Sequence, residues 1–123
     1  MKKENKELKN HNFIDAWKNA FNGIIYATTT QGNIQKQLII AVIVVIVSLF
    51  FNLNRAEFLC FLFTIVLIIF AEMVNTAIET VVDLYVDVYH PKAKIAKDVA
   101  AGGVVITTIN AIIVASFLFF DKI

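Results

Sequence analysis

The chain has 123 residues, enough for one domain rather than two, with 59% hydrophobic and 17% charged residues. Soluble domains have about 45–50% and about 25%, and a domain this small cannot bury such an excess, so apolar surface must face lipid or other subunits. The net charge of +1 argues against a nucleic-acid partner, and a single cysteine, Cys60, excludes internal disulfides and Cys-rich metal sites.

The first 37 residues begin polar and contain no early apolar run, so we expect no cleavable signal peptide. From Phe13 onward the apolar residues recur at helical spacing, at Phe13, Trp17, Ala20, Phe21, Ile24 and Ile25. This pattern predicts an amphipathic helix at about 12–30. It would lie in the membrane interface with Trp17 at headgroup level, or pack on protein; the pattern fits both.

Three apolar stretches follow, at 38–51, 58–82 and 99–120. They predict transmembrane helices at about 36–52, 56–82 and 97–120. The expected fold is a single all-α membrane domain, 1–123, of three spans plus the surface helix. The connection 52–57 is short enough to require a tight antiparallel hairpin, whereas the connection 83–98 is polar and interrupted by Pro91.

Lysine and arginine are unevenly distributed among the segments outside the spans. Six precede the first apolar stretch, 38–51, and three lie in the connection 83–98, whereas the connection 52–57 has only Arg55. By the positive-inside rule, the N-terminus and the connection 83–98 are cytoplasmic and the C-terminus lies outside.

The second predicted span carries acidic residues on one face. On a helix, Glu72, Asn75, Thr76, Glu79 and Asp83 fall within an arc of about 100°. Ionisable groups inside a membrane are costly and mark function by default; the alternative is a protonated or paired structural glutamate. The acids need a compensating positive charge, for which a divalent cation and Lys97 of the next helix are candidates.

Depth separates the acids of this face. Glu79 and Asp83 lie one turn apart near the cytoplasmic end, where a hydrated magnesium ion and a nucleotide could reach. Glu72 lies about 10 Å deeper, where the lower dielectric suits a general base. The arrangement favours a catalyst that joins a water-borne phosphate donor to a lipid-borne acceptor, although the four glycines form no phosphate-binding loop of the common kinds.

Several motifs together resemble those of the small bacterial membrane lipid kinases, prokaryotic diacylglycerol kinase and undecaprenol kinase. They are Glu72-x-x-Asn75-Thr76-Ala77-Ile78-Glu79-x-x-x-Asp83, then His90-Pro91 with Ala96-Lys97-Asp98, the run Ala100-Ala101-Gly102, and Ala20-Phe21-x-Gly23-Ile24 near the front. The resemblance spans about residues 13–120. It implies a homotrimer in the bacterial cytoplasmic membrane that transfers the γ-phosphate of MgATP to a lipid hydroxyl.

The resemblance also implies roles for individual residues. It implies that Glu72 is the catalytic base, that Glu79 binds both metal and nucleotide, and that the lipid is contacted by Glu72, Asn75 and Ala101. The other nucleotide-binding positions fall on Gln31, Asp83, Tyr89, His90, Lys97 and Asp98. A lone histidine before a proline, as at His90, is otherwise more typical of a turn. The family's second metal-binding glutamate falls on Gln31, whose amide oxygen offers no charge to magnesium.

Two questions stay open in the sequence. The pattern from Asp83 to Lys94 resembles the undecaprenol kinase branch more closely, which favours undecaprenol as acceptor over diacylglycerol. The other function classes are a proton- or cation-coupled transporter and a structural membrane subunit. A transporter needs an acid reachable from both sides of the membrane, whereas this acidic face descends toward one cytoplasmic connection, and a structural subunit gives three aligned acids no purpose.

Overall fold

The computed structural model describes residues 12–122, and its regular structure is helical. It divides into two compact units, one ending at Gln31 and the other beginning at Gly32, and each is described by itself. The lysines at 2, 3, 6 and 9, on which the orientation prediction partly depends, lie outside the described residues.

The first unit contains α2, Phe13–Thr30. Asn12 caps its N-terminus, because the Asn12 side chain accepts a hydrogen bond of 2.8 Å from the backbone N–H of Asp15. The rings of Phe13, Trp17 and Phe21 follow one another along one side, with centroids 6.1 Å apart at each step. All three side chains are more than half exposed, so the helix presents the apolar face that its spacing predicts.

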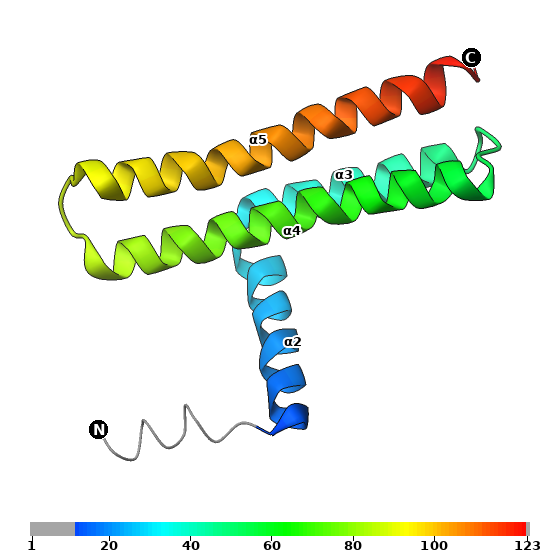
Figure 1. Cartoon of the computed structure of the whole chain (residues 1–123). Helices are drawn as coiled ribbons and strands as arrows, with labels where there is room; N and C mark the ends of the chain where they lie inside the picture. Colours follow the sequence, from blue (N-terminus) through cyan, green and yellow to red (C-terminus); the bar gives the residue numbers. More distant parts are fainter. Residues whose placement is uncertain (1–11, 123) are drawn as a thin grey trace. The chain divides into compact units, whose positions relative to one another are not determined.

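The second unit contains α3, Gly32–Ser48, α4, Arg55–Tyr85, and α5, Pro91–Phe120. Figure 1 shows α4 and α5 running side by side in opposite directions, with α3 along another side of α4. Helix α4 packs mainly against α5 and less extensively against α3. Few side chains are fully buried, and large apolar residues are exposed along all three helices, as expected of helices that face lipid.

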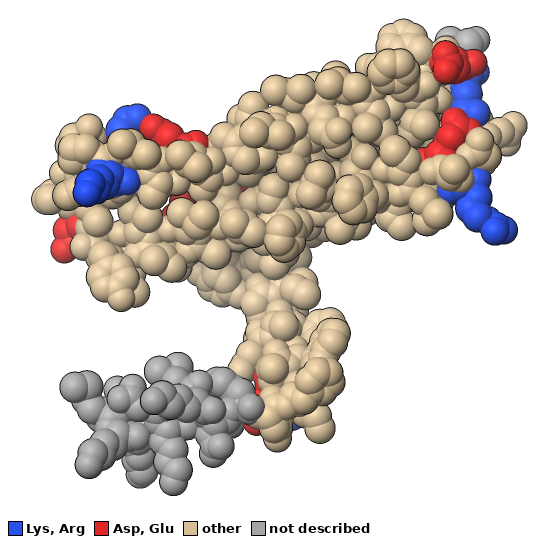
Figure 2. All heavy atoms as spheres, viewed as in Figure 1, with Lys and Arg blue, Asp and Glu red and all other residues tan. Residues whose placement is uncertain are grey.

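In the view of Figure 2, the charged side chains of this unit gather toward the two ends of its helices, and the surface between them is largely uncharged. Helices α4 and α5 are each long and apolar enough to cross a membrane. Helix α3 has 17 residues and is not by itself a candidate membrane span. A third candidate span arises if α2 and α3 are counted as one interrupted span. The prediction of an all-α membrane protein is confirmed, with two to three candidate spans.

The helix bounds differ from the predicted ones where polar residues flank the apolar runs. Helix α3 begins at Gly32 rather than 36, because glutamine and lysine are good helix formers outside an apolar environment. It ends at Ser48 rather than 52: Leu49 and Phe50 donate to carbonyls three residues back, which tightens the last turn. Asn52 then adopts a positive φ of 51°, a conformation that asparagine tolerates better than most residues.

The largest difference concerns α5, which begins six residues before the predicted start of 97. Pro91 does not interrupt the connection but occupies the first helical position, where its missing N–H costs nothing and its fixed φ suits the helix. The connection therefore shortens to 86–90, and Asp83 and Lys97 both lie on helices. That shortening brings the end of α4 close to the start of α5.

Candidate active site

Along the polar face of helix α4, burial of the side chains decreases from Glu72 toward Asp83. Glu72 and Asn75 are 4% and 6% exposed, whereas Glu79 and Asp83 are exposed. The acid that the sequence places deepest is thus the one that protein covers most. Glu72, Asn75, Glu79 and Asp83 each have a polar partner, and these partners decide what each can do.

Glu72 contacts α3 through Gln37. The Gln37 amide nitrogen, Nε2, donates a hydrogen bond of 3.4 Å to Oε2 of the Glu72 carboxylate. The donor is neutral, so it holds the carboxylate without cancelling its charge. Sequence reasoning missed Gln37, which belongs to none of the motifs. One signal could have found it: Gln37 and Glu72 each lie 15 residues from the nearer end of the predicted hairpin connection 52–57.

Asn75 and Glu79 form the next pair along the face. The Asn75 amide nitrogen donates to Oε1 of Glu79 over 3.3 Å, while the Asn75 amide oxygen is buried and has no hydrogen-bond partner. Buried polar atoms are rarely left unpaired, and an exception is often explained by an ion or a water. The atom next to the Glu79 carboxylate is the amide nitrogen. Glu79 offers a carboxylate oxygen, a ligand that suits a hard divalent cation, and Asn75 would add its amide oxygen once its amide turns over.

Within residues 12–122, no three His, Cys, Asp or Glu side chains come together as a metal site. Magnesium is commonly held through one or two carboxylates and the phosphate oxygens of a nucleotide rather than by a full protein cage. The Glu79 carboxylate, with Asn75 beside it, would fit a nucleotide-borne magnesium ion. The predicted second metal residue, Gln31, lies at the C-cap of α2 in the other unit, where its amide nitrogen donates to Thr30 over 3.4 Å.

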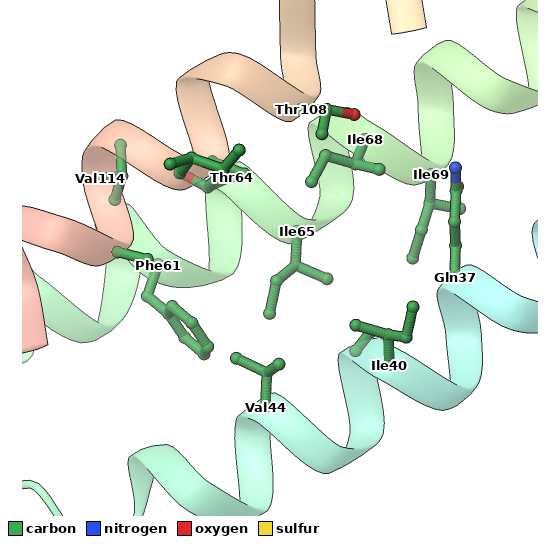
Figure 3. Close-up of a pocket in the computed structure, with 14 residues that line it drawn as sticks. Gln37, Ile40, Val44, Phe61, Thr64, Ile65, Ile68, Ile69, Thr108 and Val114 are labelled. Atoms are coloured by element: carbon green, nitrogen blue, oxygen red, sulfur yellow. The ribbon is translucent and has the colours of Figure 1, made fainter. Parts of the chain in front are cut away.

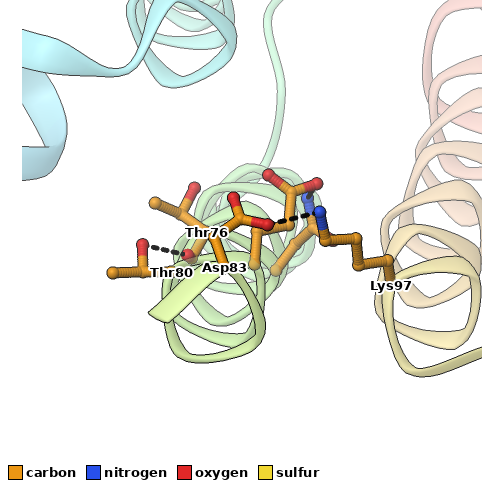
Figure 4. Close-up of polar contacts among 6 residues, drawn as sticks. Thr76, Thr80, Asp83 and Lys97 are labelled. Carbon is orange, nitrogen blue, oxygen red and sulfur yellow. Dashed lines mark hydrogen bonds and ion pairs between the residues drawn. The ribbon is translucent and has the colours of Figure 1, made fainter. Parts of the chain in front are cut away.

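Asp83 is joined to α5 by Lys97. The Lys97 ammonium lies 2.5 Å from Oδ1 of Asp83, and Figure 4 shows the lysine side chain extending from α5 toward the carboxylate on α4. The two side chains remain 40% and 64% exposed, so the pair is open to solutes. The expectation that Lys97 supplies positive charge to the acidic face is confirmed for Asp83.

The predicted nucleotide residues of the second connection surround one hollow of about 330 Å³. Its polar lining consists of Asp83, Asp87, Tyr89, His90, Lys94, Lys97 and Asp98. The structure thus brings together five predicted residues, at 83, 89, 90, 97 and 98, and adds Asp87 and Lys94. Lys94 was used for membrane orientation and for the branch comparison but was not predicted as a site residue; its spacing of three from Lys97, along one helix face, was the available signal.

Two of these residues also have structural roles. His90 caps α5, since its Nδ1 accepts a hydrogen bond of 3.2 Å from the backbone N–H of Lys92. Lys94 pairs with Asp98 one turn later at 2.6 Å. Ala101, the predicted lipid contact, is exposed on α5. A Cβ added at the neighbouring Gly102 or Gly103 would meet no atom within 4 Å, so this small-residue segment leaves room for a ligand or another chain.

An apolar cavity of about 420 Å³ lies between α3, α4 and α5 (Figure 3). Its polar lining is limited to Gln37, Thr64 and Thr108. Both threonine hydroxyls donate to carbonyls of their own helices, at 2.8 and 3.0 Å. Gln37 therefore connects two environments, the apolar cavity and the buried carboxylate of Glu72.

A family model described as prokaryotic diacylglycerol kinase matches residues 18–119. The match covers α3 and α4 and all but the last residue of α5. The chain belongs to this family. The assignment made from the motifs is thereby confirmed, and with it the class of multi-pass membrane protein.

Two curated relatives are similar over most of this family member. A diacylglycerol kinase of Synechocystis sp. (strain ATCC 27184 / PCC 6803 / Kazusa) is 37% identical over 108 residues, which cover 87% of this chain and 62% of the relative. An undecaprenol kinase of Bacillus subtilis (strain 168) is 33% identical over 111 residues, 90% of each chain. The chain thus spans less than two thirds of the first relative and nearly all of the second. Both relatives are named as kinases of lipid alcohols.

Proposed function

We propose that this family member is an ATP-dependent lipid kinase that transfers the γ-phosphate of MgATP to the hydroxyl of a membrane lipid. The observation that carries the proposal is the ordered face of α4. It holds a buried carboxylate at Glu72, the hydrogen-bonded side chains of Asn75 and Glu79, and the solvent-open hollow beyond Asp83. This order matches a reaction that joins a lipid-borne acceptor to a water-borne donor.

Each residue has a defined task in this reaction. Lys97 and Lys94 face the hollow and provide point charges for phosphate oxygens. Glu79 and Asn75 would hold the magnesium ion, which neutralises charge on the transferring phosphoryl group. Glu72 accepts the proton of the lipid hydroxyl as that oxygen bonds to the γ-phosphorus, and ADP leaves. Positioning and charge neutralisation carry most phosphoryl transfers, so the protein needs no further covalent step.

Undecaprenol is the acceptor that we favour, and diacylglycerol is the alternative. The undecaprenol kinase relative matches over 90% of both chains, whereas the diacylglycerol kinase relative extends well beyond the matched segment. The difference of four percentage points in identity in favour of the latter is small by comparison. The sequence from Asp83 to Lys94 favours the same branch.

A direct competition tests the choice of lipid. Purified protein in detergent micelles receives MgATP with undecaprenol and diacylglycerol together at equal mole fraction, and the initial rate of formation of each phosphorylated lipid is measured. We expect the higher rate with undecaprenol. A higher rate with diacylglycerol would reverse the choice of acceptor. A protein that does not turn over ATP in the presence of either lipid would contradict the lipid kinase assignment.

Orientation and assembly complete the proposal. The hollow must open toward the compartment that holds ATP, so the connection between α4 and α5 lies in the cytoplasm of a bacterial cell, with the N-terminus on the same side and the C-terminus outside. The lysines at 92, 94 and 97 at that end support this orientation. We propose a homotrimer as the assembly, supported by the exposed small-residue segment at Ala101–Gly103; crosslinking in native membranes tests it.

A further inference from the structure

We propose that Gln37 is a positioning residue for the catalytic carboxylate of Glu72. This inference rests on the proposed function, in which Glu72 is the base. The starting observation is the hydrogen bond of 3.4 Å that runs from Nε2 of Gln37 on α3 to Oε2 of Glu72 on α4. It joins two residues that are 35 positions apart in the sequence, so the bond exists only because α3 packs along α4.

A buried carboxylate needs such a partner. Glu72 is 4% exposed, and its long side chain has several rotatable bonds that must be fixed before it can meet a hydroxyl in a productive geometry. A lysine or arginine would fix it too, but would also cancel the negative charge that makes it a base. The neutral amide of Gln37 orients the Glu72 carboxylate without cancelling its charge.

The second amide atom of Gln37 strengthens the argument. Its oxygen, Oε1, is buried and has no hydrogen-bond partner. When Glu72 accepts the proton of the lipid hydroxyl, the carboxylate becomes an acid whose O–H must donate to something. A half-turn of the Gln37 amide offers Oε1 to that O–H, and no bond to Oε1 has to be broken for the turn. One glutamine can therefore serve both protonation states of Glu72.

The surroundings of Gln37 leave it few other tasks. The other polar residues of the apolar cavity, Thr64 and Thr108, are satisfied by their own helices. The neighbouring Gln35, on the same helix, is exposed. Gln37 is thus the residue at which the polar site and the apolar cavity meet, as Figure 3 shows for the cavity side.

The test replaces Gln37 with methionine, which has similar volume and no hydrogen-bonding amide, and uses Gln35→Met as the matched control. We expect Gln37→Met to lower kcat by roughly tenfold, with the KM for MgATP and the melting temperature in micelles nearly unchanged, while Gln35→Met behaves as wild type. Gln37→Asn, which keeps the amide but withdraws it by one methylene, should lose kcat as well. A wild-type kcat in both Gln37 variants would overturn the inference.

A double-mutant cycle separates positioning of Glu72 from a general packing role. Glu72→Asp keeps a carboxylate but pulls it away from α3, so adding Gln37→Met to it should lower kcat by less than about twofold. A full tenfold further loss would show that Gln37 acts independently of Glu72 and would overturn the inference. Failure of the proposed function itself is distinguishable, since it would appear as wild-type protein without lipid-dependent ATP turnover.

Discussion

Lys97 of α5 forms an ion pair with Asp83 of α4, and its ammonium lies 2.5 Å from Oδ1 of the carboxylate. The pair spans the five-residue connection 86–90 and links the first turns of α5 to the last turn of α4. Both side chains remain accessible at the rim of the hollow that also contains Tyr89, His90 and Asp98. An incoming phosphate therefore meets a lysine that is already held in place by a carboxylate.

Replacing Lys97 tests whether the hollow binds the nucleotide. Lys97→Met removes a point charge for phosphate, so we expect the KM for MgATP to rise by roughly tenfold while the melting temperature changes little, since exposed ion pairs contribute little to stability. Lys122→Met is the control, because Lys122 pairs with Glu57 at 3.3 Å at the opposite end of the helices. Equal KM values for wild type and Lys97→Met would remove Lys97 from the nucleotide site.

Glu72→Gln tests the assignment of the base. The substitution keeps the shape of the side chain and removes its basicity, so kcat should fall by at least about 100-fold, because general-base catalysis contributes about 10²–10⁴-fold. Binding of MgATP, measured by calorimetry in micelles, should remain close to wild type, since Glu72 lies about 10 Å from Glu79 along the helix. A variant that retains a tenth of the wild-type rate would contradict the assignment.

Glu79→Gln should give a different kinetic signature. Glu79 is exposed and its carboxylate accepts a hydrogen bond from the Asn75 amide nitrogen. Replacing Glu79 therefore removes the charged member of the proposed magnesium ligand pair. The magnesium concentration for half-maximal rate should increase several-fold, and nucleotide binding should weaken with it. A magnesium titration at fixed ATP measures this, with Glu57→Gln as a carboxylate control at the other end of α4; superimposable Glu79→Gln and wild-type curves would exclude Glu79 as a ligand.

Asn54→Ala tests the stability of the hairpin independently of the site. Asn54 and Glu57 form a capping box at the start of α4, in which each side chain bonds the other's backbone N–H at 2.8 and 3.2 Å. Losing the cap should destabilise the protein by about 0.5–2 kcal/mol, seen as a lower melting temperature in micelles. The kcat of the folded variant should remain unchanged, and a large loss of kcat would mean that the two ends of α4 are coupled.

Much of the fold followed from local pattern. Apolar runs and their helical spacing predicted the helices and the membrane class, because a backbone in lipid must satisfy its own hydrogen bonds and so becomes helical. The predicted helix ends were less accurate. Pro91 was interpreted as an interruption, whereas proline at the first helical position is compatible with a helix, and the sequence pattern alone does not distinguish the two positions.

The sequence also predicted the order of the site residues along α4, since Glu72, Asn75, Glu79 and Asp83 share one face of a helix at fixed spacing. What only the tertiary structure decided is which side chain from another helix meets each of them. Gln37 reaches Glu72 because α3 packs along α4, and Lys97 reaches Asp83 because α5 begins early enough to return beside α4. Spacing along one helix is fixed by its 1.5 Å rise per residue, whereas contacts between helices depend on the register and rotation of two separate elements, which packing alone sets.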